Sequence, residues 1–229
     1  MIKIENVVTP SVEQWKAVIR GMRNPLNSWD KSDSYSTHIE DVDTMETADF
    51  EFFIGENDLS LMKKLRNAGT DHRKFMRMIA VYLDITAPLY WWKEFDTYKV
   101  GTVANSCSTM HKIHAKEFTL DDFSCERLLT GMVDDDGWGW LSPLDMMKER
   151  VMFLNVCRKK FIETKDKTWW WQMIQLLPSS YNQKRTVMLN YEVLAGMYHS
   201  RKNHKLDEWV EFCKWIEELP YSELITGGV

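Results

Sequence analysis

Apolar side chains along this chain recur mostly at helical spacing. From Ser142 to Glu163 they follow one another at three- and four-residue steps, at Leu144, Met147, Val151 and Leu154. This spacing places them on one face of a helix, and Ser142-Pro143 is a typical helix start. The same reasoning predicts further helices over residues 12–22, 59–67, 119–129, 168–176 and 207–218, with another after Pro178.

The first predicted helix has local signals at both ends. Ser11 and Gln14 fit a capping box, in which each side chain accepts a hydrogen bond from the backbone of the other residue. Asn24-Pro25 then ends the helix, because proline cannot continue the backbone hydrogen-bond pattern. Gly69 marks the end of the helix at residues 59–67 in a similar way.

One stretch alternates as a strand does. Residues 78–86, MIAVYLDIT, predict a strand, and Pro88 stops its pairing and begins a helix that carries Trp91, Trp92 and Glu94. These elements predict an α+β fold that is mainly helical, with a small central antiparallel or mixed sheet. The chain has no GxGxxG or GxxxxGKS loop, which argues against Rossmann and P-loop enzymes.

The length and the irregular stretches indicate how the chain is organised. A chain of 229 residues favours a single domain, residues 1–229, with an insertion around residues 112–145. Residues 27–47 are rich in Ser, Asp and Thr and predict a long loop of the kind that carries ligand contacts or waits for a partner. The DDDGWGW run at 134–140 lacks the alternating ligand spacing of a calcium loop, so we interpret it as a solvated acidic turn and expect no metal site.

Charge and hydropathy exclude two classes of partner. The net charge is −5 and basic residues are scattered among acidic ones, whereas a nucleic-acid binder needs a clustered basic face. The amino terminus has no apolar signal region, and no stretch approaches 18 uninterrupted apolar residues. We therefore expect a cytoplasmic protein with neither a nucleic-acid nor a membrane partner. Four widely spaced cysteines without a CxxC motif are interpreted as reduced, buried thiols: Cys107, Cys125, Cys157 and Cys213.

Two features are compatible with small-molecule binding. The run from Gly101 to Thr109 has short polar side chains, which allow backbone amides to point at one anion, although plain loops have the same composition. The chain also holds 11 Trp, 10 Phe and 8 Tyr. Such rings line pockets by stacking, or fill cores and subunit interfaces.

Several motifs resemble those of the flavin-dependent thymidylate synthases. Ala87-Pro88-Leu89 resembles the strand exit of that family, Lys93-Glu94 stands where the family has Arg-Gln, and Thr97-Tyr98-Lys99 falls on its Arg-His-Arg signature. The run at 102–109 falls on the family's Ser-x-Asn-Glu-x-Ser-x-Arg loop. The chain therefore resembles a diverged member that lacks the Arg-His-Arg signature.

The carboxyl-terminal match to this family is better. Leu177-Pro178 resembles the family's Leu-Pro, and Lys184 falls on the arginine that follows it. Asn190, Leu194 and Arg201 then keep the family's Asn-(three residues)-Leu-(six residues)-Arg spacing.

The resemblance covers roughly residues 59–112 and 168–219 and implies reductive methylation of deoxyuridylate (dUMP) to thymidylate. In that family reduced FAD delivers hydride, NADPH replenishes the reduced flavin and methylenetetrahydrofolate supplies the carbon, so no enzyme nucleophile is needed. The resemblance also implies a homotetramer whose sites lie between subunits.

The implied site residues fall into two groups. Arg201 would hold the pyrimidine ring, because its planar fork suits carbonyl acceptors. The substrate and its phosphate would also contact Lys184, Asn105, Ser106, Ser108, Thr109, Lys93 and Glu94. The flavin would contact Thr97, Tyr98, Lys99, Asn190, His204, Lys205 and His72.

Structural interpretations of these residues stay open as well. Arg201 fits an ordinary cation at a helix end, Asn190 a helix cap, and Lys93-Glu94 a surface or intersubunit ion pair. Because the Arg-His-Arg cations are missing, the alternative function is a catalytically inactive homo-oligomer of the same fold that binds a nucleotide or a protein partner.

Overall fold

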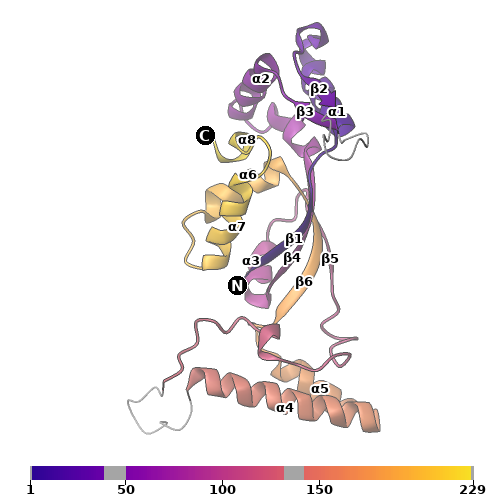
Figure 1. Ribbon diagram of the computed structural model, residues 1–229, viewed down its shortest axis with the longest axis vertical. Coiled ribbons are helices and arrows are strands. Elements are labelled where there is room, and N and C mark those ends of the chain that lie inside the picture. Colours follow the sequence, from indigo (N-terminus) through magenta and orange to yellow (C-terminus); the bar gives the residue numbers. More distant parts are fainter. Residues whose placement is uncertain (1, 39–49, 132–141, 228–229) are drawn as a thin grey trace. The chain divides into compact units, whose positions relative to one another are not determined.

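The fold is mainly helical with a small sheet, as the sequence pattern predicted (Figure 1). The computed structural model describes residues 2–38, 50–131 and 142–227. A four-stranded sheet has the strand order β1 (Lys3–Val8), β4 (Ala80–Pro88), β6 (Asn182–Asn190) and β5 (Val103–Ser106). A separate antiparallel pair consists of β2 (Tyr35–His38) and β3 (Phe50–Phe53).

Eight α-helices and four 3-10 turns lie in the described ranges. The α-helices are α1 (Val12–Arg23), α2 (Glu56–Asn67), α3 (Leu89–Phe95), α4 (Pro143–Thr164), α5 (Lys167–Leu176), α6 (Tyr191–Arg201), α7 (Asp207–Glu217) and α8 (Glu223–Thr226). The 3-10 turns are η1 (Asn24–Leu26), η2 (Trp29–Lys31), η3 (Arg73–Met78) and η4 (Leu120–Asp122). None of the helices described is both long enough and apolar enough to cross a lipid bilayer.

Contacts between residues divide the chain into two compact units, each built from separate stretches. Unit 1 comprises Met1–Ile4, Asp84–Thr97 and Asn105–Thr186. Unit 2 comprises Glu5–Leu83, Tyr98–Ala104 and Val187–Val229. Every strand of the four-stranded sheet contributes residues to both units. The single domain with an insertion around residues 112–145 stays a prediction.

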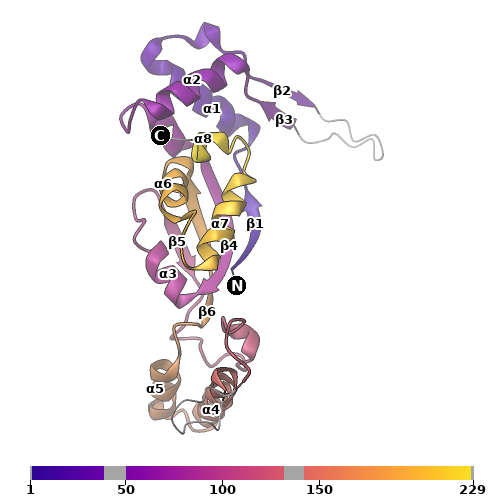
Figure 2. The same cartoon turned by 90° about the vertical axis from the view of Figure 1, so that its left-hand side faces the viewer.

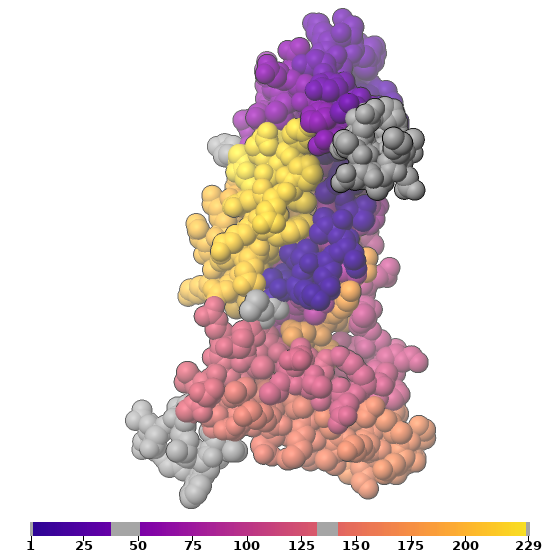
Figure 3. All heavy atoms as spheres, viewed as in Figure 1, coloured from indigo at the N-terminus to yellow at the C-terminus, as the bar shows by residue number. Residues whose placement is uncertain are grey.

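Unit 2 has its core where η3 packs against α1, α2 and α6. Phe75 and Met76 of η3 are buried, as are Trp15 of α1 and Leu194 of α6. Helices α7 and α8 pack against α6, and in the space-filling view this yellow carboxyl-terminal segment adjoins the purple segment that includes α2 (Figure 3). Unit 2 thus joins the first third of the chain to its carboxyl-terminal helices.

Unit 1 is built around the antiparallel pair α4 and α5, which lie side by side in both ribbon views (Figures 1 and 2). Leu154 and Cys157 of α4 and Met173 of α5 are fully buried. Phe118 and Phe123 complete this apolar cluster. Removing these side chains from water is the main stabilising contribution to such a cluster.

The structure confirms the predicted helices whose first residues carry capping signals in the sequence. Ser11 Oγ accepts from the Gln14 backbone at 3.3 Å and Gln14 Oε1 accepts from the Ser11 backbone at 2.8 Å, so α1 has its capping box. Ser142 caps α4 through the Asp145 backbone at 3.1 Å. The predictions near residues 168–176 and 207–218 correspond to α5 and α7, and the predicted strand 78–86 to β4.

The predicted loop at residues 27–47 is wrong at residues 35–38, and residues 29–31 form the turn η2. Residues 35–38 form β2, in which Tyr35 pairs with Phe53 of β3 and their rings stack at 5.4 Å between centroids. This pairing needs a partner strand that the local composition does not reveal. Residues 39–47 lie outside the described residues, as does the acidic turn predicted at 134–140.

Two predicted helices are also wrong. Residues 119–129 form only the short turn η4, because the Asp122 carboxylate accepts from the Thr119 backbone at 2.9 Å and Phe123 then bridges to Tyr181. The run after Pro178 begins with β6 rather than a helix. Its alternating polar and apolar residues pair with neighbouring strands, and α6 starts only at Tyr191.

Candidate functional site

The predicted site residues are divided between the two units, and each set is described by itself. Unit 2 holds Tyr98, Lys99, Asn190, Arg201, His204, Lys205 and His72. Unit 1 holds Lys93, Glu94, Thr97, Asn105, Ser106, Ser108, Thr109 and Lys184.

Arg201 is the centre of a compact cluster in unit 2. It is the last residue of α6, and its Nε donates to the Tyr98 phenol at 2.9 Å. Its guanidinium carbon lies 5.0 Å from the ring centroid of Trp209, which is fully buried on α7. A guanidinium over an aromatic face gains cation–π attraction. Together, the phenol and the indole hold the guanidinium plane in one orientation.

His204 also contacts the guanidinium of Arg201. Its Nε2 is 3.0 Å from Arg201 Nη1, and its Nδ1 is 3.1 Å from the Leu206 backbone nitrogen. A neutral imidazole has one donor and one acceptor nitrogen, so the tautomer decides which of these two contacts is a hydrogen bond. The guanidinium of Arg201 carries N–H donors of the kind that suit an acceptor oxygen of a ligand.

Asn190 has the capping role considered for it. Its Oδ1 accepts from the Val193 backbone at 3.0 Å at the start of α6, and its Nδ2 donates to the Gly101 carbonyl at 3.3 Å. Gly101 has φ +82° and a side chain there would meet Asn190 Nδ2 at 2.3 Å. Asn190 therefore ties the turn at Gly101 to α6, and the flavin contact implied for it stays a prediction.

The other residues of the unit 2 set are exposed. Lys99 and Lys205 project into solvent, and Lys99 has no ion pair within the described part of the chain. His72 lies on the turn before η3, where its backbone donates to Gly69. Of this set, the structure brings Tyr98, Arg201 and His204 into mutual contact through Arg201.

In unit 1, Lys184 contacts a residue that the sequence did not single out. Its ammonium pairs with the Asp84 carboxylate at 3.0 Å, and the Thr186 hydroxyl donates to the same carboxylate at 2.6 Å. Asp84 belongs to β4, and its only sequence signal is an acidic residue at an alternating position of an apolar strand. The Lys184 charge is thus partly satisfied within the protein.

The polar run at 101–109 is not one continuous loop. Residues 103–106 form β5, in which Asn105 and Ser106 are exposed. The Cys107 backbone donates to the Lys184 carbonyl at 2.9 Å, and Ser108 Oγ accepts from the His111 backbone at 2.9 Å. In an extended strand successive amides point in opposite directions, so the amides of residues 103–106 do not converge on one anion.

The short helix α3 carries the remaining unit 1 residues. Lys93 is exposed and Glu94 half-buried. Thr97 closes the end of α3, because its hydroxyl donates to the Glu94 carbonyl at 2.7 Å. Thr97 thus acts as a cap here, and its flavin contact stays a prediction.

The cysteines are only partly as expected. All four are free thiols, and Cys157 and Cys213 are buried, but Cys107 is exposed and Cys125 half-buried. Burial raises the pKa of the Cys213 thiol to about 11. Because the thiolate is the reactive form, Cys213 is not a nucleophile near neutral pH.

Comparison with known proteins identifies similar solved structures but no matching protein-family model or curated protein sequence. Among solved structures, thymidylate synthase X (ThyX) from Helicobacter pylori with FAD and dUMP is 14% identical, covers 99% of this chain and 97% of its own, and has a TM-score of 0.63. The UMP/dUMP methylase PolB from Streptomyces cacaoi, bound with 5-Br dUMP, is 14% identical at coverages of 99% and 95%, with a TM-score of 0.60. The chain therefore has the flavin-dependent thymidylate synthase-like fold that the sequence resemblance implied.

Proposed function

We propose that this protein binds a pyrimidine nucleotide at the Arg201 cluster, defined as Tyr98, Arg201, His204 and Trp209, and methylates it as a flavin-dependent thymidylate synthase does. The observation that carries this proposal is the half-buried guanidinium held between a phenol, an imidazole and an indole. A fixed fork loses little conformational freedom when a ligand binds.

The chemistry of a uracil ring suits this cluster. Its carbonyl oxygens accept hydrogen bonds, and the guanidinium of Arg201, which lies against the His204 imidazole, carries charge-assisted donors. The half-buried Tyr98 ring adds an apolar edge, while Trp209 supports the guanidinium from the buried side. The similar structures were solved with dUMP or with a bromo-substituted dUMP, which supports this ligand class.

FAD and the co-substrates follow from the same proposal. Bound reduced FAD would supply the hydride, with NADPH as its reductant and methylenetetrahydrofolate as the carbon donor. Lys99, which is exposed and follows Tyr98 in the chain, would pair with an anionic group of the flavin. Contacts of Lys184 and Ser108 with a nucleotide phosphate stay predictions of the sequence resemblance. We further propose that the active protein is a cytoplasmic homotetramer.

A second candidate is a nucleotide-binding protein without turnover. Three observations favour it. Lys184 is paired with Asp84, and Asn190 uses both its amide oxygen and its amide nitrogen in hydrogen bonds within the protein. Thr97-Tyr98-Lys99 also stands where the resemblance sets Arg-His-Arg, so fewer cations are available for a ligand. Losing a charge-assisted contact costs about 1.5–3 kcal/mol. Weak flavin binding is the expected consequence.

Two measurements separate the candidates. Visible absorption of the purified protein with added FAD, before and after dUMP, reports a flavin site; product analysis with NADPH and methylenetetrahydrofolate reports thymidylate. If the protein is an enzyme, its flavin absorption bands shift when dUMP is added and it forms thymidylate. Thymidylate formation is then lost in Arg201→Ala and kept in Lys202→Ala, the control that removes the neighbouring charge. A protein that binds dUMP through Arg201 but takes up no flavin and forms no thymidylate is the second candidate.

A further inference from the structure

Unit 2 contains a cavity of about 410 Å³ that none of the site residues lines. It is bounded by α1, the turn η2 and the β2–β3 pair, which extends beside α1 and α2 in Figure 2. Its wall includes Lys16, Arg20, Trp29, Tyr35, Ser36 and Phe52. The volume lies within the range of about 300–1,000 Å³ that is usual for small-molecule sites.

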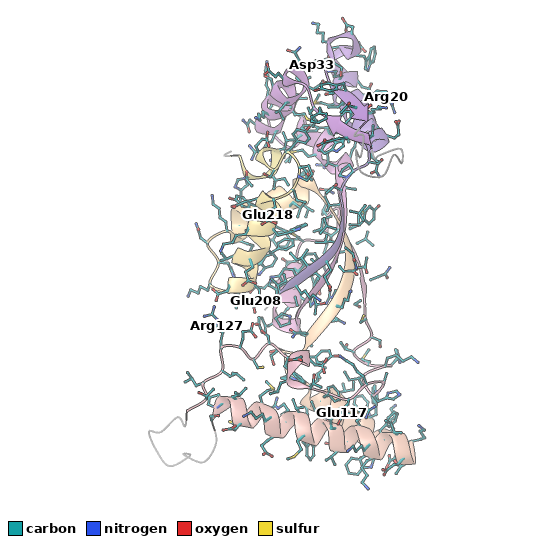
Figure 4. All side chains as sticks on the ribbon, in the orientation of Figure 1. Arg20, Asp33, Glu117, Arg127, Glu208 and Glu218 are labelled. Carbon is teal, nitrogen blue, oxygen red and sulfur yellow. The ribbon has the colours of Figure 1, made fainter. Side chains whose placement is uncertain are left out.

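The described wall of this cavity is positively charged. Lys16, Arg20 and Arg23 line it, and none of the described residues that line it is acidic. Lys16 pairs with Glu13 at 2.8 Å on the surface of α1. Arg20, labelled in Figure 4, has no ion pair within the described ranges. Its guanidinium is therefore available to a ligand anion.

Arg23 has a different role from Arg20. It is buried, its Nε donates to Asp58 at 2.5 Å, and it also bonds the carbonyls of Ser28 and Lys31. Asp58 in turn accepts from the Ser34 hydroxyl. The Asp58 carboxylate therefore neutralises the charge of Arg23, and the hydrogen bonds fix its side chain at the base of the cavity. Arg20 is then the cation that can pair with a ligand.

The cavity also has aromatic walls held in place by contacts outside it. Phe52 is stacked on Trp15 with an interplanar angle of 4°, and Tyr35 is stacked on Phe53. Trp29 Nε1 donates to Asn24 at 2.8 Å. Yet Trp29 remains 51% exposed and Tyr35 59% exposed. Large rings fixed but exposed beside a cation suit a planar ligand, because rings stack on rings.

We infer that this cavity, here called the α1 cavity, binds a small aromatic anion: one ring or a fused pair of rings that carries a phosphate or carboxylate. The anion pairs with Arg20, the ring packs against Trp29, Tyr35 and Phe52, and the Ser36 hydroxyl supplies a further hydrogen bond. The site uses no residue of the Arg201 cluster, so it stands independently of the proposed methylation.

The test is a titration of the full-length protein with phenyl phosphate, followed by NMR of isoleucine methyl groups. Ile19 lines the α1 cavity, whereas Ile113 lies in the unit 1 core and serves as the internal reference. The Ile19 methyl is expected to shift and saturate while Ile113 stays unchanged. Inorganic phosphate and benzyl alcohol, which carry only the anion or only the ring, are expected to bind at least about tenfold more weakly, because each lacks one contact set.

Variants assign the binding to this cavity. Arg20→Gln is expected to weaken phenyl phosphate at least about tenfold, whereas Lys64→Gln, which removes an exposed charge of α2 outside the cavity, leaves it unchanged. Ser36→Trp fills the cavity and abolishes binding with Arg20 still present. The inference is overturned if the Ile19 shift does not saturate, if Arg20→Gln binds like the wild type, or if only Arg201→Ala removes the signal.

Discussion

The Nε atom of Arg201 donates to the phenol oxygen of Tyr98 across 2.9 Å, although the two residues are 103 positions apart in the chain. This bond joins the segment after α3 to the end of α6. These are the two stretches in which the sequence resembles the flavin-dependent thymidylate synthases. Tyr98 is the middle residue of Thr97-Tyr98-Lys99, the stretch that the sequence resemblance sets against the family's Arg-His-Arg signature, and its phenol oxygen accepts from the arginine.

Tyr98→Phe tests the role of this bond. The variant keeps the ring and removes the phenol oxygen, so the guanidinium is less well fixed. Because the lost bond acts on dUMP only through the orientation of Arg201, dUMP is expected to bind about twofold to tenfold more weakly. Isothermal titration calorimetry measures the affinity. Tyr82→Phe removes an exposed phenol elsewhere in unit 2 and is the control. Equal affinity of Tyr98→Phe and the wild type would show that the phenol does not orient Arg201.

Asn190 variants separate its two hydrogen bonds. Asn190→Ala removes the cap of α6 and the bond to Gly101, and is expected to lower the free energy of unfolding by about 1–2 kcal/mol. Asn190→Asp keeps the capping oxygen and should retain most of the stability. Urea denaturation followed by circular dichroism measures both. A large loss in Asn190→Asp would assign the stability to the Gly101 contact instead.

The buried pair of Arg23 and Asp58 predicts a pH dependence. Burial acts to raise the pKa of Asp58, but hydrogen bonds from Ser32, Ser34 and Arg23 outweigh it and hold the pKa below its ordinary value of 3.8. A carboxylate with a lowered pKa stabilises the folded state above the unfolded-state pKa, and this contribution is lost as the pH falls through the folded-state pKa. We therefore expect stability to fall as the pH drops below about 4.

Asp58→Asn tests that origin. The variant leaves the buried Arg23 charge without its partner, so a loss of about 3–5 kcal/mol is expected near neutral pH. Its stability should also change less than that of the wild type between pH 5 and pH 3. Lys16→Ala, which removes an exposed ion pair, is the comparison and should alter stability little. The same acid dependence in both Asp58→Asn and the wild type would rule out Asp58 as the titrating group.

In unit 1 the free energy of unfolding is expected to depend on which face of α4 is truncated. Leu154 is fully buried on α4, so Leu154→Ala leaves a cavity and is expected to cost about 2–5 kcal/mol. Met152, two positions away, is 57% exposed, and Met152→Ala should change stability little. Chemical denaturation monitored by tryptophan fluorescence compares the two. Similar losses of stability in Leu154→Ala and Met152→Ala would contradict the assignment of Leu154 to the buried face of α4.

The sequence predicted those elements whose signals are local. Ser11 with Gln14 and Ser142 with Pro143 act within one helical turn, so the starts of α1 and α4 are confirmed. The strands β1, β2, β3, β5 and β6 were missed because a strand is stabilised by pairing with a distant segment. In β6 the polar residues between Gln183 and Thr186 hid the alternation.

The sequence likewise predicted some residues of the candidate site and missed others. Family spacing indicated Arg201, Tyr98 and His204, which do meet in the structure. Nothing in the local sequence shows that Trp209 supports the guanidinium or that Asp84 pairs with Lys184, because both contacts depend on the folding of segments far apart.

Binding of dUMP to wild-type protein and to Arg201→Ala, measured by calorimetry under identical conditions, tests the central claim most directly. The Arg201 cluster predicts saturable binding with one site per chain, weakened about tenfold to a hundredfold in Arg201→Ala and unchanged in Lys202→Ala. Absence of dUMP binding, or equal affinity of Arg201→Ala and the wild type, would contradict it.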